Sequence, residues 1–233
     1  MVKEHLQLSD TDSVLDLGCG PGWLAIAFAP FVGTVVAVDP EPSMLEAARA
    51  AAAEVEARIE FIEASAFDLG CHLGMFRTVT IGRAFHWMDR SDALRRLNTL
   101  IEPNGALVLF NDVRPDVPEN VWNKHYASLI GSYTSTDARI PHARLRHEAI
   151  LLASPFNLLE RMGVIERRLV PLERLVDRAL SMSTSSPEQL GPLKERLQET
   201  MDQMSQFATN GFVVEIIESQ ALIARRGETD TSR

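Results

Sequence analysis

The distribution of apolar residues divides the first 112 residues into short strands that alternate with helices. Apolar runs rich in valine, leucine and isoleucine predict buried strands at 13–17, 34–38, 59–63, 78–81 and 106–110. Apolar residues at helical spacing predict helices at 22–29, at 43–55 and from Ser91 onward. The expected core face of the helix at 43–55 consists of Met44, Leu45, Ala48, Ala51 and Val55. This alternation predicts an α/β fold with a mostly parallel sheet.

The pattern changes after Asp112. Residues 115–162 have the periodicity of two or three helices, with no strand predicted between them. Residues 103–105 are expected to form a turn before the strand at 106–110. Further strands are expected at 163–170, 211–217 and 219–225, and further helices at 172–180 and 187–207. The length of 233 residues fits a single domain, 1–233, in which 115–162 is an insertion.

A turn rich in glycine joins the first predicted strand to the helix that follows it. Residues 14–22 read VLDLGCGPG, with glycine at positions 18, 20 and 22. Glycine permits a sharp turn and the close approach of a ligand, and the helix presents free N–H groups and the positive end of its dipole. The pattern predicts a nucleotide-type site at the carboxyl end of a parallel strand. Trp23 replaces the third glycine of the dinucleotide pattern G-x-G-x-x-G, which disfavours a nicotinamide or flavin cofactor.

Asp39 directly follows the apolar strand at 34–38. A carboxylate at this place can accept hydrogen bonds from both hydroxyl groups of a ribose, as the acidic residue of dinucleotide-binding folds does. Asp39 therefore indicates an adenosine-containing ligand and does not choose between cofactors. The alternative is an N-cap role at the following helix, for which Ser43 is better placed because Pro40 and Pro42 intervene.

The nonapeptide at 14–22 resembles motif I of the class I S-adenosyl-L-methionine-dependent methyltransferases, (V/I/L)-L-D-(L/I/V)-G-C-G-x-G. Residues 100–107, LIEPNGAL, resemble the turn L-(L/K)-P-(G/N)-G-x-(L/F) before strand five of that family. The similarity is to the small-molecule branch that includes methyltransferase type 11 and trans-aconitate methyltransferase-like proteins. It implies a Rossmann-like, mostly parallel sheet of seven strands in the order 3-2-1-4-5-7-6, with strand seven antiparallel and helices on both faces. It also implies that 115–162 forms a helical substrate lid after strand five.

The resemblance implies S-adenosyl-L-methionine as the cofactor and S-adenosylhomocysteine (SAH) as its product. Ser65 and Ala66 occupy the family's adenine-binding positions, and Phe67 is expected to pack against the adenine ring. A serine is a weaker partner for the adenine amine than an acidic residue, and strand four reads FRTV where F-D-L-V is common. The implied cofactor-binding residues are Asp16, Gly18, Cys19, Gly20, Gly22, Asp39, Pro40, Met44, Ser65, Ala66, Phe67 and Arg83.

Residues 82–89, GRAFHWMD, resemble the segment A-x-H-W-(F/M)-D that lines the cleft between the methionine moiety and the acceptor in small-molecule methyltransferases. The resemblance implies His86, Trp87 and Arg83 as the catalytic residues. A histidine can act as a general base near neutral pH or donate a hydrogen bond to the acceptor. A tryptophan offers an electron-rich face, and an arginine can pair with a substrate carboxylate. The alternatives are a structural histidine, a core tryptophan and a surface arginine.

Residues 139–147 contain three arginines and two histidines on an otherwise acidic chain. This basic stretch is consistent with binding an anionic acceptor, and a solvated surface is the alternative. Trp122, His125, Tyr126 and Tyr133 lie upstream at helical spacings. They are candidates for lining an acceptor pocket, with packing between helices as the alternative.

The net charge of −9 and the isoelectric point near 5.2 disfavour a nucleic-acid partner, which requires a basic surface. Cys19 and Cys71 form neither a disulfide framework nor a metal-binding pattern, so no metal is expected. We expect no signal peptide, no membrane partner and a cytoplasmic location, because the first residues lack an apolar segment and no apolar run approaches membrane-spanning length. A monomer and a homodimer both fit the sequence.

Together these features predict in-line methyl transfer to a small molecule, most simply O-methylation of a carboxylate or hydroxyl group, with His86 as base or orienting residue. Two alternatives stay open. One is a non-catalytic relative that binds S-adenosyl-L-methionine or SAH, with a plugged acceptor cleft. The other is a nicotinamide-dependent oxidoreductase, which Trp23 disfavours.

Overall fold

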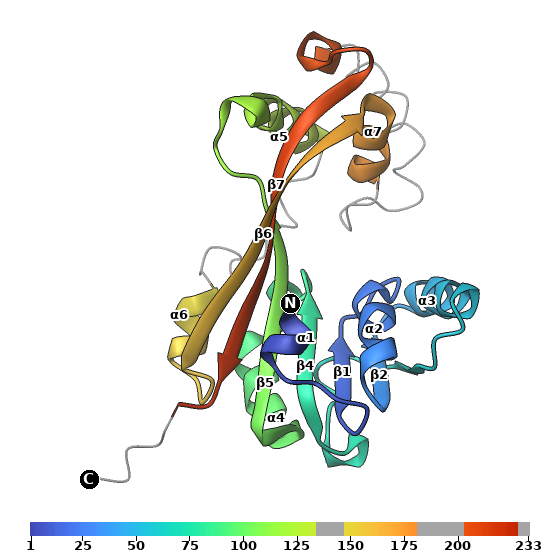
Figure 1. Ribbon diagram of the computed structural model, residues 1–233, viewed down its shortest axis with the longest axis vertical. Helices are drawn as coiled ribbons and strands as arrows, with labels where there is room; N and C mark the ends of the chain where they lie inside the picture. The colour runs from blue at the N-terminus through green and yellow to red at the C-terminus, as the bar shows by residue number, and fades with distance from the viewer. Residues whose placement is uncertain (134–146, 181–202, 228–233) are drawn as a thin grey trace. The chain divides into compact units, whose positions relative to one another are not determined.

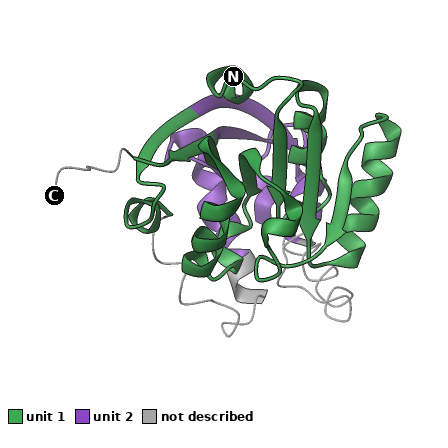
Figure 2. Ribbon diagram, turned by 90° about the horizontal axis from the view of Figure 1, so that it is seen from below, with its two compact units in different colours: residues 1–111, 141–162, 220–233 green, residues 112–140, 163–219 purple. Residues whose placement is uncertain are grey.

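The computed structural model describes residues 1–133, 147–180 and 203–227. The chain forms two compact units (Figure 2). The first unit consists of residues 1–111, 141–162 and 220–233, and the second consists of 112–140 and 163–219. The single domain with a lid at 115–162 stays a prediction. In the described part of the chain, no helix is both long and apolar enough to cross a membrane.

Seven strands form one sheet in the order β3-β2-β1-β4-β5-β7-β6 (Figure 1). The sheet is mostly parallel and β7 is antiparallel, which confirms the predicted fold class and strand order. β1 lies between β2 and β4 and is parallel to both. The carboxyl ends of these three strands therefore meet at one edge of the sheet. The strands are β1 (Ser13–Leu17), β2 (Thr34–Asp39), β3 (Glu60–Glu63), β4 (Phe76–Gly82), β5 (Ile101–Val113), β6 (Leu158–Pro171) and β7 (Phe212–Arg225).

The helices begin at residues that suit a helix start. α3 has Pro42 in its first turn, where the missing N–H of proline costs no intrahelical bond. α4 is capped by Asp89, whose Oδ1 accepts hydrogen bonds from the backbone N–H groups of Ser91 and Asp92. The helices are α1 (Val2–His5), α2 (Trp23–Phe28), α3 (Pro42–Glu54), α4 (Arg90–Leu100), α5 (Val121–Tyr133), α6 (His147–Leu152) and α7 (Leu172–Leu180).

Each unit has its own apolar core. In the first unit, the central strands contribute fully buried residues such as Leu15, Val79 and Leu107. The second unit has a separate core that includes Trp122, Tyr126, Val170, Leu175, Ala179, Met204 and Val213. Because the two cores share no residue, each unit has a hydrophobic driving force of its own.

The expected core face of α3 was partly wrong. Met44 is 40% exposed and Val55 is 60% exposed, whereas the buried residues are Leu45, Ala48 and Ala52. These three residues are spaced i, i+3 and i+7 and form one narrow stripe on the helix. A stripe of this width excludes Met44, and Val55 lies beyond the last helical residue, Glu54.

Three strand boundaries also differ from the sequence prediction. The expected turn at 103–105 lies inside β5 as an irregularity, because Phe76 pairs with Ile101 whereas Thr78 already pairs with Ala106. The two segments expected at 211–217 and 219–225 form one continuous strand, β7. β6 begins at Leu158, inside the region expected to be helical. β6 is at the end of the strand order and is mostly exposed, so it lacks the apolar run that marks a buried strand.

Most of the helix predicted at 187–207 and most of the basic stretch at 139–147 lie outside the described residues. The described part of the former ends in a short 3₁₀ turn at Ser205–Phe207. Of the latter, the structure describes His147, the first residue of α6.

Candidate cofactor and acceptor site

The loop between β1 and α2 has the backbone conformation that the glycine pattern predicts. Gly18, Gly20 and Gly22 have φ angles of 68°, 52° and 80°, in the left-handed region that favours glycine. The backbone N–H groups of Gly18 and Cys19 donate to the carbonyl oxygen of Val38 at 2.8 and 3.0 Å. The loop is therefore fastened to the carboxyl end of the neighbouring strand β2.

The three glycines differ in what surrounds them. A Cβ atom at Gly18 would lie 2.6 Å from the Cβ of Ala84, and one at Gly22 would lie 3.0 Å from the Cβ of Ala48. A Cβ atom at Gly20 would meet no heavy atom within 4 Å among the described residues beyond its chain neighbours. Gly18 and Gly22 thus allow close packing within the protein, whereas Gly20 faces open space that a ligand can enter.

Asp39 connects this loop to the start of α3. Its Oδ2 accepts a hydrogen bond from the N–H of Gly20 at 2.8 Å, and its Oδ1 accepts one from the N–H of Glu41 at 3.0 Å. Each carboxylate oxygen retains capacity for a further hydrogen bond. The N-cap residue of α3 is Glu41, so the alternative in which Asp39 or Ser43 caps this helix is wrong.

Asp16 lies underneath the loop and is fully buried. Its Oδ2 accepts a hydrogen bond from the N–H of Ala25 in α2 at 3.0 Å, and the hydroxyl of Thr80 donates to its Oδ1 at 2.9 Å. Burial raises the pKa of Asp16 to about 7, against the opposing effect of these two hydrogen bonds. Asp16 therefore joins α2 to β4, and its role in cofactor binding stays a prediction.

Cys19 is also directed into the protein. Its side chain packs with Ala25, Val35 and Leu45, and burial raises the pKa of its thiol to about 12, with Asp16 and Asp39 adding to the effect. The thiol is neutral at physiological pH, so Cys19 presents only its backbone to a ligand at the loop. Pro40 and Met44 are exposed where β2 leads into α3.

The segment after β3 forms a compact turn around Asp68. The backbone N–H and the hydroxyl of Ser65 donate to Oδ2 of Asp68 at 2.8 and 2.6 Å, and these bonds hold the pKa of Asp68 below its usual value. The N–H of Phe67 donates to the Ser65 hydroxyl oxygen at 3.2 Å, and the Phe67 side chain is 58% exposed. Ser65 thus uses its hydroxyl within the turn. The sequence reasoning named residues 65–67 and missed Asp68, which fixes their conformation.

The loop after β4 places three predicted residues at the same edge of the sheet. Arg83 has a φ of 55°, and its N–H donates to the carbonyl oxygen of Phe110 at the next strand at 3.1 Å. A left-handed residue other than glycine is strained, and such residues occur often at functional sites. The rings of His86 and Trp87 lie 4.8 Å apart, and Trp87 is 48% exposed, so it is not a core residue.

His86 is half-buried. Burial lowers its pKa, and the positive charge of Arg90 lowers it further. His86 is therefore neutral at pH 7 and able to accept a proton. The same region contains His147, whose Nδ1 lies 3.4 Å from Nη1 of Arg90. Sequence reasoning counted His147 only as part of the basic stretch and did not name Arg90.

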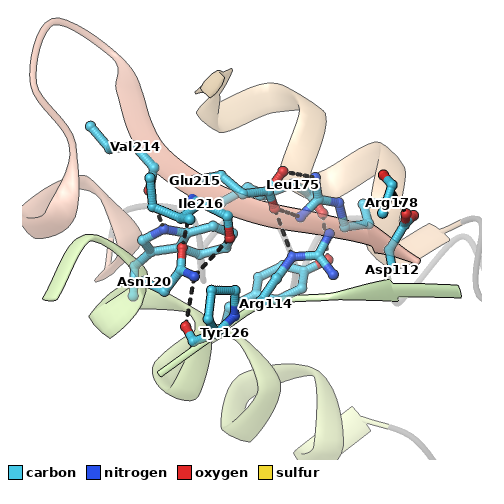
Figure 3. A network of polar contacts seen from close by, with 12 residues as sticks. Asp112, Arg114, Asn120, Tyr126, Leu175, Arg178, Val214, Glu215 and Ile216 are labelled. Atoms are coloured by element: carbon cyan, nitrogen blue, oxygen red, sulfur yellow. Dashed lines mark hydrogen bonds and ion pairs between the residues drawn. The ribbon is translucent and has the colours of Figure 1, made fainter. Parts of the chain in front are cut away.

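Trp122 and Tyr126 of the second unit are packing residues. Nε1 of Trp122 donates to the carbonyl oxygen of Val214 at 2.7 Å. The hydroxyl of Tyr126 donates to the carbonyl oxygen of Leu175 at 2.8 Å (Figure 3). Both side chains are buried, which favours the packing alternative over a pocket role. His125 contacts the ring of Phe207 edge-on at 4.8 Å. The side chain of Tyr133 lies outside the described residues.

A buried carboxylate organises the second unit. Glu215 is 1% exposed and binds Nε of Arg114 at 2.7 Å and Nη1 of Arg178 at 2.8 Å (Figure 3). Burial alone would raise the pKa of Glu215, but the hydrogen bonds from Arg178 and Arg114 outweigh it and the pKa is lowered. Glu215 is therefore ionised and joins the end of β5 to α7.

Comparisons with known proteins agree with this geometry. A family profile described as "Methyltransferase domain" matches residues 14–105. An uncharacterized methyltransferase of Mycobacterium tuberculosis is 32% identical over 162 residues, which cover 69% of this chain and 79% of the relative. The crystal structure of the YcgJ protein from Bacillus subtilis superposes with a TM-score of 0.58 at 19% identity and covers 97% of both chains. Coclaurine N-methyltransferase, bound to N-methylheliamine and SAH, superposes with a TM-score of 0.54 at 17% identity, covering 96% of this chain and 70% of that one.

Three findings indicate the same family: the identity and coverage of the mycobacterial relative, the profile match and the order of the strands in the sheet. The profile match contains the glycine loop, Asp39 and the loop after β4. The chain belongs to the class I S-adenosyl-L-methionine-dependent methyltransferase family.

Proposed function

We propose that the protein transfers the methyl group of S-adenosyl-L-methionine to an oxygen atom of a small-molecule acceptor. One observation carries the cofactor part of this proposal. Gly20 faces open space, and its backbone N–H donates to Asp39. Both residues lie at the edge of the sheet where β1, β2 and β4 end.

The residues present suit S-adenosyl-L-methionine. The free lone pairs of Asp39 would accept the ribose hydroxyls, and the backbone of Gly18–Gly20 would lie against the amino-acid part. Phe67 and Met44 are exposed apolar side chains after β3 and β2, where they would cover the adenine ring. When bound, the cofactor supplies a methyl group activated by a positively charged sulfur.

The acceptor would lie beyond the end of β4, next to His86 and Trp87. His86 would accept the proton of an acceptor hydroxyl, for which it must be neutral, as burial and Arg90 ensure at pH 7. The exposed face of Trp87 would exclude water and favour the positive charge near the transferred methyl group. A small acceptor agrees with the acidic chain, which does not suit a nucleic acid.

Replacement of His86 by glutamine tests the acceptor part. We expect kcat with a hydroxyl acceptor to fall by about 100-fold, the typical contribution of a general base, with SAH affinity within about threefold of the wild type. In the wild type, kcat should rise with pH as His86 loses its proton, with a pKa below the usual histidine value of 6.5, and should level off near pH 7. This rise should disappear in His86→Gln.

The measurement is transfer of a labelled methyl group to a panel of small phenols, alcohols and carboxylic acids. His72→Gln is the control, because His72 is an exposed histidine in the 3₁₀ turn Cys71–Leu73 and has no proposed role in binding or catalysis. An unchanged rate and an unchanged pH profile in His86→Gln would assign His86 to packing.

A further inference from the structure

Arg90 and His147 form a second polar pair beside the loop that carries His86. Arg90, the first residue of α4, is only 4% exposed, and its Nη1 lies 3.4 Å from Nδ1 of His147 in α6. The ring of His147 also meets the ring of Phe85 edge-on, with 5.3 Å between centroids. Phe85 is buried and directly precedes His86 in the same 3₁₀ turn. Two contacts thus hold the His147 ring next to the proposed acceptor site.

The contact with Arg90 defines which nitrogen of His147 carries the proton. A guanidinium group can only donate hydrogen bonds, so Nδ1 of His147 must be the acceptor. Nδ1 is therefore unprotonated and its lone pair accepts from Arg90, so the proton of the neutral ring is on Nε2. An imidazole in this tautomer presents an N–H donor on the side of the ring away from Arg90.

The charges around His147 favour the neutral ring. Burial lowers the pKa of His147, and the positive charge of Arg90 and the nearby His86 lower it further. Glu148 acts in the opposite direction, and its carboxylate is engaged in an ion pair with Arg161. The His147 side chain is only partly buried.

We propose that His147 is a second acceptor-binding residue, which donates a hydrogen bond from Nε2 to a carboxylate or carbonyl oxygen of the acceptor, and that Arg90 positions it by fixing the tautomer. The inference rests on the proposed methyl transfer. It divides the work between two histidines, since His86 accepts a proton whereas His147 donates a hydrogen bond. The acceptor class that fits carries an oxygen acceptor close to the methylated oxygen, as hydroxy acids and carboxylic acids do.

Two variants of His147 test separately the hydrogen bond accepted by Nδ1 and the one donated by Nε2. The amide oxygen of asparagine can take the place of Nδ1 and accept from Arg90, but asparagine has no donor at the place of Nε2. The longer glutamine can bring its NH2 group to the place of Nε2. With the acceptor found by the labelled-methyl assay, we expect His147→Asn to raise the acceptor KM about tenfold, as loss of one hydrogen bond does. His147→Gln should restore KM to within about threefold, and both variants should bind SAH like the wild type.

The tautomer gives a readout that does not depend on activity. Nitrogen NMR of the full chain at pH 7.5 should show His147 neutral, with Nδ1 unprotonated and Nε2 protonated. A proton on Nδ1, or a KM that is unchanged in His147→Asn, would overturn the proposal. Equal losses in the asparagine and glutamine variants would reduce His147 to a structural residue and would overturn it too. If the wild type transfers no methyl group to any acceptor, the proposed function fails, and the NMR result still tests the tautomer separately.

Discussion

Alanine at Gly20 is expected to weaken SAH binding about 100-fold while lowering the free energy of unfolding by only about 1 kcal/mol. The stability cost is small because the new Cβ meets no heavy atom within 4 Å among the described residues beyond its chain neighbours, so the left-handed φ of 52° is the main penalty. The binding loss is large because the methyl group enters the space assigned to the cofactor. Calorimetric titration with SAH and thermal unfolding measure the two effects.

Gly211→Ala is the matched control. Gly211 has a φ of 81°, and within the described chain no heavy atom beyond its neighbours lies within 4 Å of its added Cβ. It lies in the turn before β7, so the backbone penalty is similar and SAH affinity should not change. Gly18→Ala should instead lower stability strongly, because its Cβ would lie 2.6 Å from that of Ala84. Wild-type SAH affinity in Gly20→Ala would contradict the assignment of this space.

Asparagine at Asp39 is expected to lower SAH affinity by at least about 100-fold, because hydrogen bonds to a charged group contribute about 1.5–3 kcal/mol each. The single amide oxygen cannot serve both backbone N–H groups, of Gly20 and of Glu41, and also two ribose hydroxyls. The amide NH2 group would face one of those N–H donors. We therefore expect Asp39→Asn to weaken both the anchoring of the glycine loop and the hydrogen bonds to the ribose.

Glu41→Gln is the control for Asp39→Asn. Glu41 lies two residues after Asp39 and its side chain is exposed, so this variant removes a nearby negative charge and leaves the Asp39 carboxylate in place. SAH affinity should stay within about threefold of the wild type, as expected for a screened surface charge. The same titration compares the two variants. Similar losses in both would mean that net charge, and not the position of the Asp39 carboxylate, governs binding.

Local backbone requirements explain why the conformation of the glycine loop could be predicted from sequence. Three left-handed residues within five positions call for glycine, and a carboxylate after a buried strand is visible in the sequence itself. The role of Asp16 could not be seen in this way. It depends on the register that places Asp16 opposite Thr80, which is 64 residues away in the chain.

The surroundings of the proposed acceptor site were predicted less completely, because they depend on contacts between distant segments. His147 belongs to a basic stretch by sequence, yet in the structure it accepts a hydrogen bond from Arg90, 57 residues earlier. Trp122 and Tyr126 fit a pocket wall and a helix interface equally well by spacing, and only their burial and hydrogen bonds identify packing. β6 was predicted too short because an exposed edge strand does not need apolar residues.

The most direct test of the central claim is a calorimetric titration of the wild-type chain with SAH and, separately, with NADH. We expect one SAH to bind per chain with a Kd between about 1 μM and 1 mM, the range usual for enzyme ligands, and NADH not to bind. An absence of heat at millimolar SAH, or NADH binding that SAH does not displace, would contradict the central claim.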